Sequence, residues 1–173
     1  TYKERRRLAE KDPIKKTETT KLFEEAQTFL AYLGVKNVWV PGEEADDVIA
    51  LLCQKLEGAK VIYTGDKDLL QLVSEDTSVN YNRAFHAAGF STNAHPLGVP
   101  YGLTSFYKAL VGDPSDGFGG IPGFGPKAFE KLFAQYKESG LLWMADVIDR
   151  DAPEELRPYA DADPVVKKIW ENW

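Results

Sequence analysis

The fold is decided by the stretch Tyr63-Thr64-Gly65-Asp66-Lys67-Asp68-Leu69-Leu70-Gln71-Leu72. The run just before it, Lys60 to Tyr63, predicts a short buried strand, and an apolar helical turn follows the two aspartates. Residues two apart in an extended backbone point to the same side. We therefore expect Asp66 and Asp68 to project together from the carboxyl end of the strand, which is where open α/β sheets bind ligands.

Helical and strand-like patterns alternate on both sides of this stretch. Apolar stripes and boundary residues predict helices at Tyr2–Lys11, Thr17–Leu33 and Glu43–Glu57, and strands at Val35–Val40, Lys60–Tyr63 and Thr77–Tyr81. This order predicts an α/β fold with a parallel, Rossmann-like sheet and crossover helices.

A loop is expected from Arg83 to Pro100, rich in Gly, Ala, Asn and Pro. It carries His86 and His95. No further metal ligands stand near them in the sequence, so we expect two surface histidines.

Beyond residue 100 the pattern becomes helical. The predicted helices are Leu103–Val111, Pro126–Tyr136, Leu141–Ile148 and Val165–Trp170. We therefore expect two domains: residues 1–100 as an α/β core that includes a basic segment at 1–21, and residues 101–173 as a helical subdomain.

Composition is ordinary for a globular protein, with 43% hydrophobic and 28% charged residues among 173. One cysteine, Cys53, excludes an internal disulfide and favours a reducing compartment. No run approaches the ~18 apolar residues of a membrane span, so we expect no membrane association. The chain starts at Thr1 rather than Met, and we expect it to be part of a longer protein.

The net charge of −6 is unevenly distributed. Residues 1–21 hold eight Lys or Arg against four Asp or Glu, which gives this segment +4 and the remainder −10. A basic segment beside an acidic body suits an enzyme that binds phosphates with one part and metal ions with another. A solvated basic helix would have the same composition.

Three acidic groups stand at predicted element boundaries: Glu44, Asp46 and Asp47; Asp66 and Asp68; Asp113 and Asp116. Each has a structural alternative. Acids in a first helical turn favour the helix dipole, Asp68 is suited to cap the following turn, and Asp113 with Pro114 resembles a helix start. Together the groups predict one metal site assembled from distant parts of the chain.

The run Gly123-Phe124-Gly125-Pro126-Lys127 is a glycine-rich turn before a predicted helix, with Pro126 suited to the first helical position. Backbone N–H groups at a helix N-terminus bind phosphate well. With the helix that precedes it, the turn predicts a helix–loop–helix that holds a DNA backbone without reading bases.

These motifs together resemble the flap endonuclease / 5′-3′ exonuclease superfamily, closest to phage 5′-exonucleases and to the 5′-nuclease domain of bacterial DNA polymerase I. The resemblance rests on Pro41-Gly42-Glu43-Glu44-Ala45-Asp46-Asp47, on Thr64-Gly65-Asp66-Lys67-Asp68, and on Gly112 to Asp116 followed by Gly120 to Lys127. It implies a PIN-like nuclease core with a helix-three-turn-helix subdomain. It also implies a structure-specific 5′-nuclease for 5′-ended, flap or nicked DNA, in the cytoplasm of a bacterium or a phage-infected cell.

The resemblance implies roles for particular residues. Asp46, Asp47 and Asp66, with Glu44 further out, match the site of one Mg²⁺ ion, and Asp68, Asp113 and Asp116 match the site of a second; Mn²⁺ can substitute. Lys3 and Arg6 match residues at the base of a helical arch that meet the scissile phosphate. The DNA-binding part, often with a K⁺ ion, corresponds to Gly120, Ile121, Gly123, Gly125 and Lys127.

The chain departs from the family pattern in two places. Gly117 and Gly119 stand where the family commonly has Asn and often Pro, which predicts a looser turn. The family also begins with a strand that ends in an aspartate ligand, and another acid precedes the arch. The present sequence starts at the arch and contains neither of these two acids. We therefore expect a monomer that is catalytically incomplete alone, or one that keeps a cleaved N-terminal piece. Without the upstream strand, the strands at Val35–Val40 and Val61–Tyr63 would lack a partner. Adding that strand with its aspartate should restore activity.

Two other functions fit parts of the sequence. A non-catalytic duplex-binding module would use only the glycine-rich turn. A phosphatase with an aspartate nucleophile would explain Asp66-Lys67-Asp68, but neither the glycine-rich turn nor the basic segment.

Overall fold

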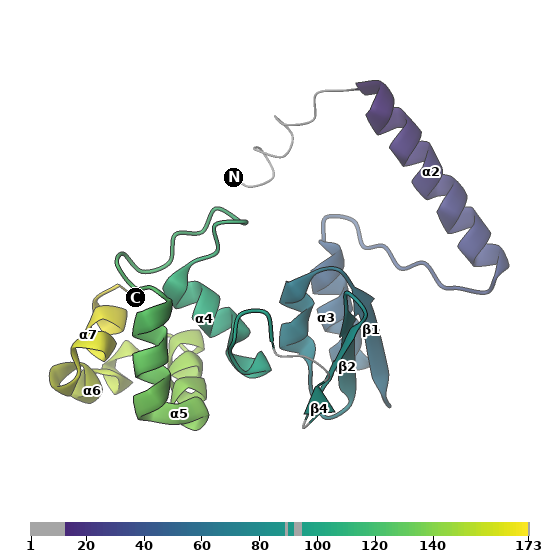
Figure 1. The fold of residues 1–173 in the computed structure, drawn as a ribbon. Coiled ribbons are helices and arrows are strands. Elements are labelled where there is room, and N and C mark those ends of the chain that lie inside the picture. The colour runs from purple at the N-terminus through teal and green to yellow at the C-terminus, as the bar shows by residue number, and fades with distance from the viewer. Residues whose placement is uncertain (1–12, 89, 92–94, 173) are drawn as a thin grey trace. The chain divides into compact units, whose positions relative to one another are not determined.

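The structure is a computed structural model that describes residues 13–172 except 89 and 92–94. The chain divides into two compact units, residues 1–52 and 53–173, which are described separately (Figure 1). The domain boundary expected near residue 100 lies inside the second unit and stays a prediction. No helix among the described residues is long and apolar enough to cross a membrane.

The first unit contains the helix α2 (Pro13–Tyr32) and most of α3 (Ala45–Lys55). Pro13 begins α2 because a first helical residue needs no N–H partner, so the helix starts four residues before the predicted Thr17. The predicted helix Tyr2–Lys11 lies outside the described residues. The predicted strand at Val35–Val40 is wrong: this segment pairs with no strand among the residues that the structure describes.

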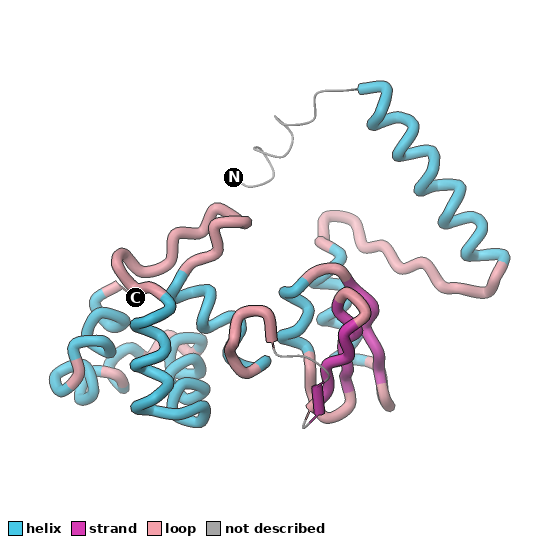
Figure 2. Tube along the Cα trace, in the orientation of Figure 1, coloured by secondary structure: helices cyan, strands magenta, loops and turns pink. Residues whose placement is uncertain are grey.

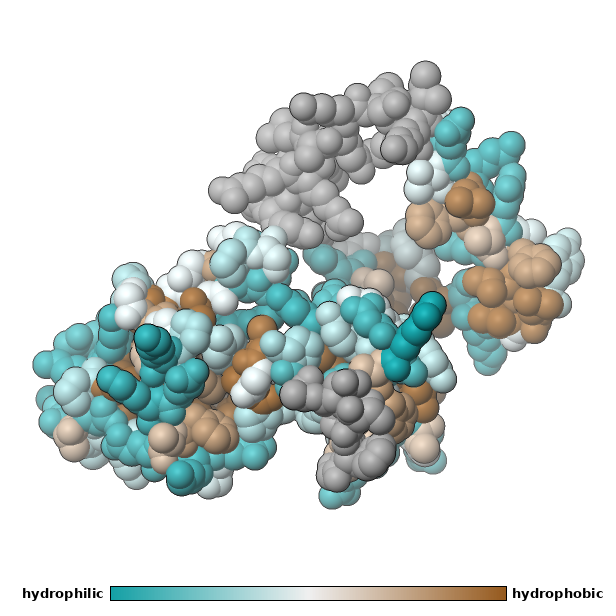
Figure 3. Space-filling model, in the orientation of Figure 1, coloured by the Kyte–Doolittle hydropathy of each residue, from teal (hydrophilic) through white to brown (hydrophobic). Residues whose placement is uncertain are grey.

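Large apolar side chains of the first unit are exposed, although the apolar pattern at Val35–Val40 had predicted a strand. Trp39 is 79% exposed and Val38 is 56% exposed. The apolar stripe of α2 is exposed in the same way, with Phe23 and Phe29 both above 60% (Figure 3). A strand requires a backbone partner for its N–H and C=O groups, and none is assigned to this segment.

The second unit begins with a four-stranded sheet in the order β1-β2-β3-β4. The strands of this sheet are magenta in Figure 2. Its strands are β1 (Lys60–Thr64), β2 (Thr77–Tyr81), β3 (Ala84–Ala87) and β4 (Phe90–Ser91). β1 pairs with β2 in parallel, with Ile62 opposite Val79. β2–β3 and β3–β4 are antiparallel, so the predicted parallel sheet is in fact mixed. Val61–Tyr63, which was expected to lack a partner, has β2 on one side; β1 is at the edge of the described sheet, and its other side is unpaired among the described residues.

The hairpin between β2 and β3 lies where a loop was expected. Tyr81 pairs with Ala84, and the two residues between them, Asn82 and Arg83, have φ of 48° and 70°. Positive φ at both central residues is typical of the tight turn whose twist matches a hairpin. The usual sequence signal for this turn is Asn-Gly, and Arg83 in place of Gly conceals it.

Both histidines are buried, which corrects the expectation of surface histidines. His86 on β3 is 1% exposed, and its Nδ1 lies 2.9 Å from the Tyr101 hydroxyl. The backbone N–H of Leu97 donates to Nδ1 of His95, and His95 Nε2 lies 3.1 Å from Oγ1 of Thr104. These polar partners make burial of the two rings tolerable and connect the sheet with the helical part of the unit.

Helices form the rest of the second unit. They are η2 (Tyr101–Leu103), α4 (Thr104–Val111), α5 (Pro126–Asp149), η3 (Pro153–Glu155), α6 (Arg157–Ala162) and α7 (Pro164–Glu171). α5 starts with Pro126 as predicted and changes direction at Lys137, where φ is 60°, so the two predicted helices are two segments of one run. The core lies between α4, α5, α6 and α7 and includes Leu103, Leu132, Leu141, Val147 and Val166.

We predict that the free energy of unfolding falls as the pH drops below about 6.5, the ordinary pKa of histidine. Burial lowers the pKa of His86, and burial and then His86 lower the pKa of His95. The unfolded chain therefore takes up protons first. Each histidine should cost up to about 1.4 kcal/mol per pH unit between its unfolded and folded pKa.

Urea titrations between pH 5 and 8 measure this slope. Protonation of Nδ1 would break the bond from Leu97, so the variant His95→Gln should show a shallower pH slope than the parent whatever its absolute stability. Equal stability of the parent across this range would contradict the prediction.

Candidate metal centre

The first part of the site lies just beyond β1, where the chain enters the short 3₁₀ helix η1 (Lys67–Leu72). Asp66 caps this helix: its Oδ1 accepts a hydrogen bond of 2.9 Å from the backbone N–H of Asp68. The cap is therefore Asp66 and not Asp68. Because the backbone turns into η1 at Lys67, the expectation that Asp66 and Asp68 project side by side from an extended chain is wrong. The side chain of Asp68 takes no part in this cap.

The second part of the site is a tight loop after α4. Two glycines close it: a Cβ on Gly120 would lie 2.4 Å from the backbone nitrogen of Gly112, and one on Gly112 would lie 2.8 Å from the carbonyl carbon of Gly119. The chain segments at Gly112 and Gly120 thus cross in close contact, and any side chain at either position would push them apart. The crossing is fixed by the N–H of Ile121, which donates to the carbonyl of Leu110 at 2.9 Å.

Inside this loop, Asp113 begins a turn rather than a helix. The backbone N–H groups of Asp113 and Phe118 each donate to the carbonyl of the other, at 2.8 and 2.9 Å. Oδ1 of Asp113 accepts from the backbone N–H of Ser115 at 3.0 Å. The structural alternative of a helix start at Asp113 and Pro114 is thus wrong. An aspartate that bonds the N–H two residues ahead favours a turn equally well.

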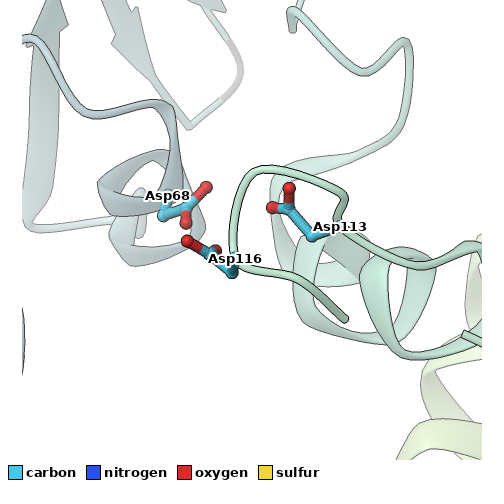
Figure 4. Close-up of side chains that lie close together, drawn as sticks. All are labelled: Asp68, Asp113 and Asp116. Carbon is cyan, nitrogen blue, oxygen red and sulfur yellow. The ribbon is translucent and has the colours of Figure 1, made fainter. Parts of the chain in front are cut away.

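The loop brings three carboxylates together, although they come from two distant segments. Single oxygen atoms of Asp68, Asp113 and Asp116 all lie within 4.8 Å of one another (Figure 4). Asp113 is buried, Asp68 is half-buried and Asp116 is exposed. These are the three residues that the family resemblance suggested for the second metal ion.

A lysine that the sequence analysis missed lies among these carboxylates. Nζ of Lys108, on α4, lies 2.5 Å from Oδ1 of Asp68, 2.5 Å from Oδ2 of Asp113 and 4.0 Å from Oδ2 of Asp116. The only available signal was a single lysine within the apolar run Tyr107 to Val111, one helical turn before Gly112. A second lysine, Lys67, lies 3.9 Å from Oδ2 of Asp113.

The opposite charges of Lys108 and Asp113 shift the pKa values of both side chains. Burial alone would lower the pKa of Lys108, but its close contacts with the carboxylates of Asp113 and Asp68 outweigh burial and raise the pKa above its usual value. Burial would likewise raise the pKa of Asp113, whereas Lys108 and Ser115 hold it well below its usual value. Both groups are therefore charged at neutral pH, and the site is a partly buried network of ions.

The other predicted acids have different surroundings. Asp46 and Asp47 are exposed in the first turn of α3, and Glu44 just precedes that helix. All three belong to the first unit, and the structure describes their positions only within that unit. Asp66 is exposed at its capping position. Lys3 and Arg6 lie outside the described residues.

The glycine-rich turn precedes α5 as expected. Gly125 is the N-cap residue of α5, and Gly123, with φ of 67°, and Lys127 are exposed. The tip of the Lys168 side chain, from α7, lies beside Gly123. Ile121 is buried in the core and Gly120 takes part in the backbone crossing, so these two residues have structural roles.

Comparison with known proteins supports one family. The family model described as "5'-3' exonuclease, N-terminal resolvase-like domain" matches residues 1–95. DNA polymerase I of Mycobacterium tuberculosis is 42% identical over 127 residues, which cover 69% of this chain and 14% of that protein. The thermostable DNA polymerase I of Thermus thermophilus is 39% identical over 132 residues, 72% of this chain and 15% of the relative.

A shorter relative matches more of its own length. A 5'-3' exonuclease of Streptomyces coelicolor is 34% identical over 146 residues, which cover 80% of this chain and 48% of that protein. The chain therefore spans about half of this relative and a much smaller part of the polymerases.

Proposed function

The chain belongs to the 5'-3' exonuclease family, whose model covers more than half of it, and we propose that it acts as a metal-dependent 5′-nuclease on DNA. The observation that carries the proposal is the meeting of Asp68, Asp113 and Asp116 within 4.8 Å. They come from segments more than 40 residues apart in the sequence. Like charges at this distance repel each other and need a cation among them. In the metal-free protein that cation is the Lys108 ammonium group, and we propose that a divalent ion takes this role when bound.

The donor set fits a divalent cation of the Mg²⁺ type. Mg²⁺ and Mn²⁺ prefer carboxylate and water oxygens, while zinc sites commonly use His or Cys. All three side chains that meet here are carboxylates, and the two histidines bond Tyr101, Leu97 and Thr104 instead. We assign Asp68, Asp113 and Asp116 to one ion.

From the family resemblance alone we propose a second ion, with Asp46, Asp47 and Asp66 as its ligands and Glu44 further out. When bound, two such ions supply an activated water and stabilise the leaving oxygen in phosphodiester hydrolysis. Lys3 and Arg6 would offset the charge that develops on the phosphate.

The turn before α5 is proposed to hold the DNA backbone. A helix N-terminus directs N–H groups and a partial positive charge outward, and exposed Lys127 adds a full charge in its first turn. Such contacts fix the position of DNA without reading its sequence. A K⁺ ion at this turn, and a preference for flap or nicked duplexes, belong to the same proposal.

The test of catalysis is cleavage of 5′-labelled single-stranded, nicked and flap DNA with Mg²⁺ or chelator. It should be run with the chain alone and with the chain mixed with a peptide that carries an upstream strand ending in Asp. We expect Mg²⁺-dependent release of 5′ products, reduced at least about 100-fold by Asp113→Asn. Asn keeps the oxygen that accepts from Ser115 but lacks the charge.

The control is Asp76→Asn, because Asp76 pairs with Lys60 and takes no part in the cluster. It should cleave like the parent. Duplex binding without cleavage in either arrangement would contradict the nuclease and favour the alternative function, a non-catalytic DNA-binding module.

Binding to DNA gives a second prediction. Lys127→Ala should weaken binding to all duplexes by a similar factor and make binding less salt-dependent, because one phosphate contact is lost. Fluorescence anisotropy in EDTA with duplexes of different sequence measures this. Lys131→Ala, a lysine one turn further along α5, is the control and should bind nearly as the parent does. A loss confined to one base sequence would contradict backbone binding.

A further inference from the structure

Lys108 occupies the space that a cation between Asp68 and Asp113 would need. Its nitrogen lies 2.5 Å from one oxygen of each carboxylate. Mg²⁺ binds oxygen at about 2.0–2.1 Å. A metal ion bound to these same two oxygens would therefore clash, sterically and electrostatically, with the ammonium group in its present position.

Lys108 also neutralises part of the cluster's charge. The Asp113 side chain is only 7% exposed, and a buried carboxylate without a counter-ion is strongly destabilising. Lys67 is a weaker partner, since its nitrogen is 3.9 Å from Asp113 and its side chain is 34% exposed. Lys108, at 17% exposed, contacts Asp68 as well.

Displacement of the ammonium group needs a side chain that can change its rotamer, and Lys108 has one. Lysine carries a compact charge on a flexible four-carbon stem, and Asp116 at the outer side of the cluster is exposed to solvent. Movement of the ammonium group away from the two carboxylates requires rotation of the stem and no change in α4.

We propose, on the basis of the metal site assigned above, that Lys108 is a built-in counter-ion which holds Asp68, Asp113 and Asp116 together until a divalent cation displaces its ammonium group. The exchange of one cation for another sets the metal affinity of the site. Lys108 is thus a positioning residue that trades metal affinity for stability of the metal-free protein.

The first experiment measures Mn²⁺ binding by calorimetry and melting temperature without DNA. Lys108→Met keeps most of the apolar stem and removes the charge. It should lower the melting temperature of the metal-free protein and tighten Mn²⁺ binding at least about tenfold, because no ammonium group must be displaced. Lys108→Arg, which keeps the charge, should stay close to the parent.

Lys60→Met is the matched control. Lys60 is also a poorly exposed lysine paired with an aspartate, Asp76, in the same unit, but it does not contact the cluster. It should lose stability without a change in Mn²⁺ affinity. Equal or weaker Mn²⁺ binding by Lys108→Met than by the parent would overturn the proposal.

A second experiment needs no variant. Amine labelling of the parent protein, read by mass spectrometry, reports the exposure of each lysine with and without saturating Mn²⁺. Labelling of Lys108 should rise several-fold with Mn²⁺, relative to Lys60. Unchanged or reduced labelling, in samples whose melting temperature shows bound metal, would overturn the proposal.

The counter-ion role of Lys108 and the metal site itself would be contradicted by different results. Metal binding with no displacement of Lys108 contradicts the counter-ion role and leaves the nuclease assignment standing. Absence of Mn²⁺ binding in both the parent and Lys108→Met contradicts the metal site itself, and with it the exchange.

Discussion

The contacts of Lys108 with Asp68 and Asp113 are the interaction on which the site depends. Asp68 belongs to η1, which follows the first strand of the sheet, whereas Lys108 belongs to α4 in the helical part of the same unit. The Lys108–Asp68 pair therefore joins two distant segments, whereas the Lys108–Asp113 pair holds the loop that directly follows α4. They also relieve the repulsion that three carboxylates within 4.8 Å would otherwise produce.

Backbone geometry supplies the rest of the constraint. The close crossing of Gly112 and Gly120 fixes both ends of the loop that carries Asp113 and Asp116. Ile121, directly after the crossing, is buried in the core with Leu110 and Phe106. The acids are thus placed by packing as well as by charge, which limits how far they can separate when the cation between them changes.

Much of this arrangement is readable from the sequence, because it rests on local rules. The strand before Asp66, the proline that opens α5 and the helix at Val165 follow from β-branched runs, N-terminal proline and apolar periodicity. The grouping of Asp68 with Asp113 and Asp116 came from family resemblance rather than spacing. The helix caps considered as alternatives at Asp68 and Asp113 were both wrong, since an aspartate in a turn and one at a helix start have the same sequence signature.

Other features could not be predicted because they depend on long-range contacts. Lys108 resembles any surface lysine until α4 packs beside η1. His86 and His95 looked exposed because their partners, Tyr101 and Thr104, lie 15 and 9 residues away. Val35 to Val40 has a strand-like composition, but composition does not supply a pairing partner.

The most direct test of the account is anomalous diffraction from crystals of the protein grown with Mn²⁺. We predict an anomalous peak in contact with Asp68, Asp113 and Asp116, with the Lys108 nitrogen moved away from Oδ1 of Asp68 and Oδ2 of Asp113. A peak found only elsewhere on the protein, or an ammonium group that keeps both carboxylate contacts beside bound Mn²⁺, would contradict it.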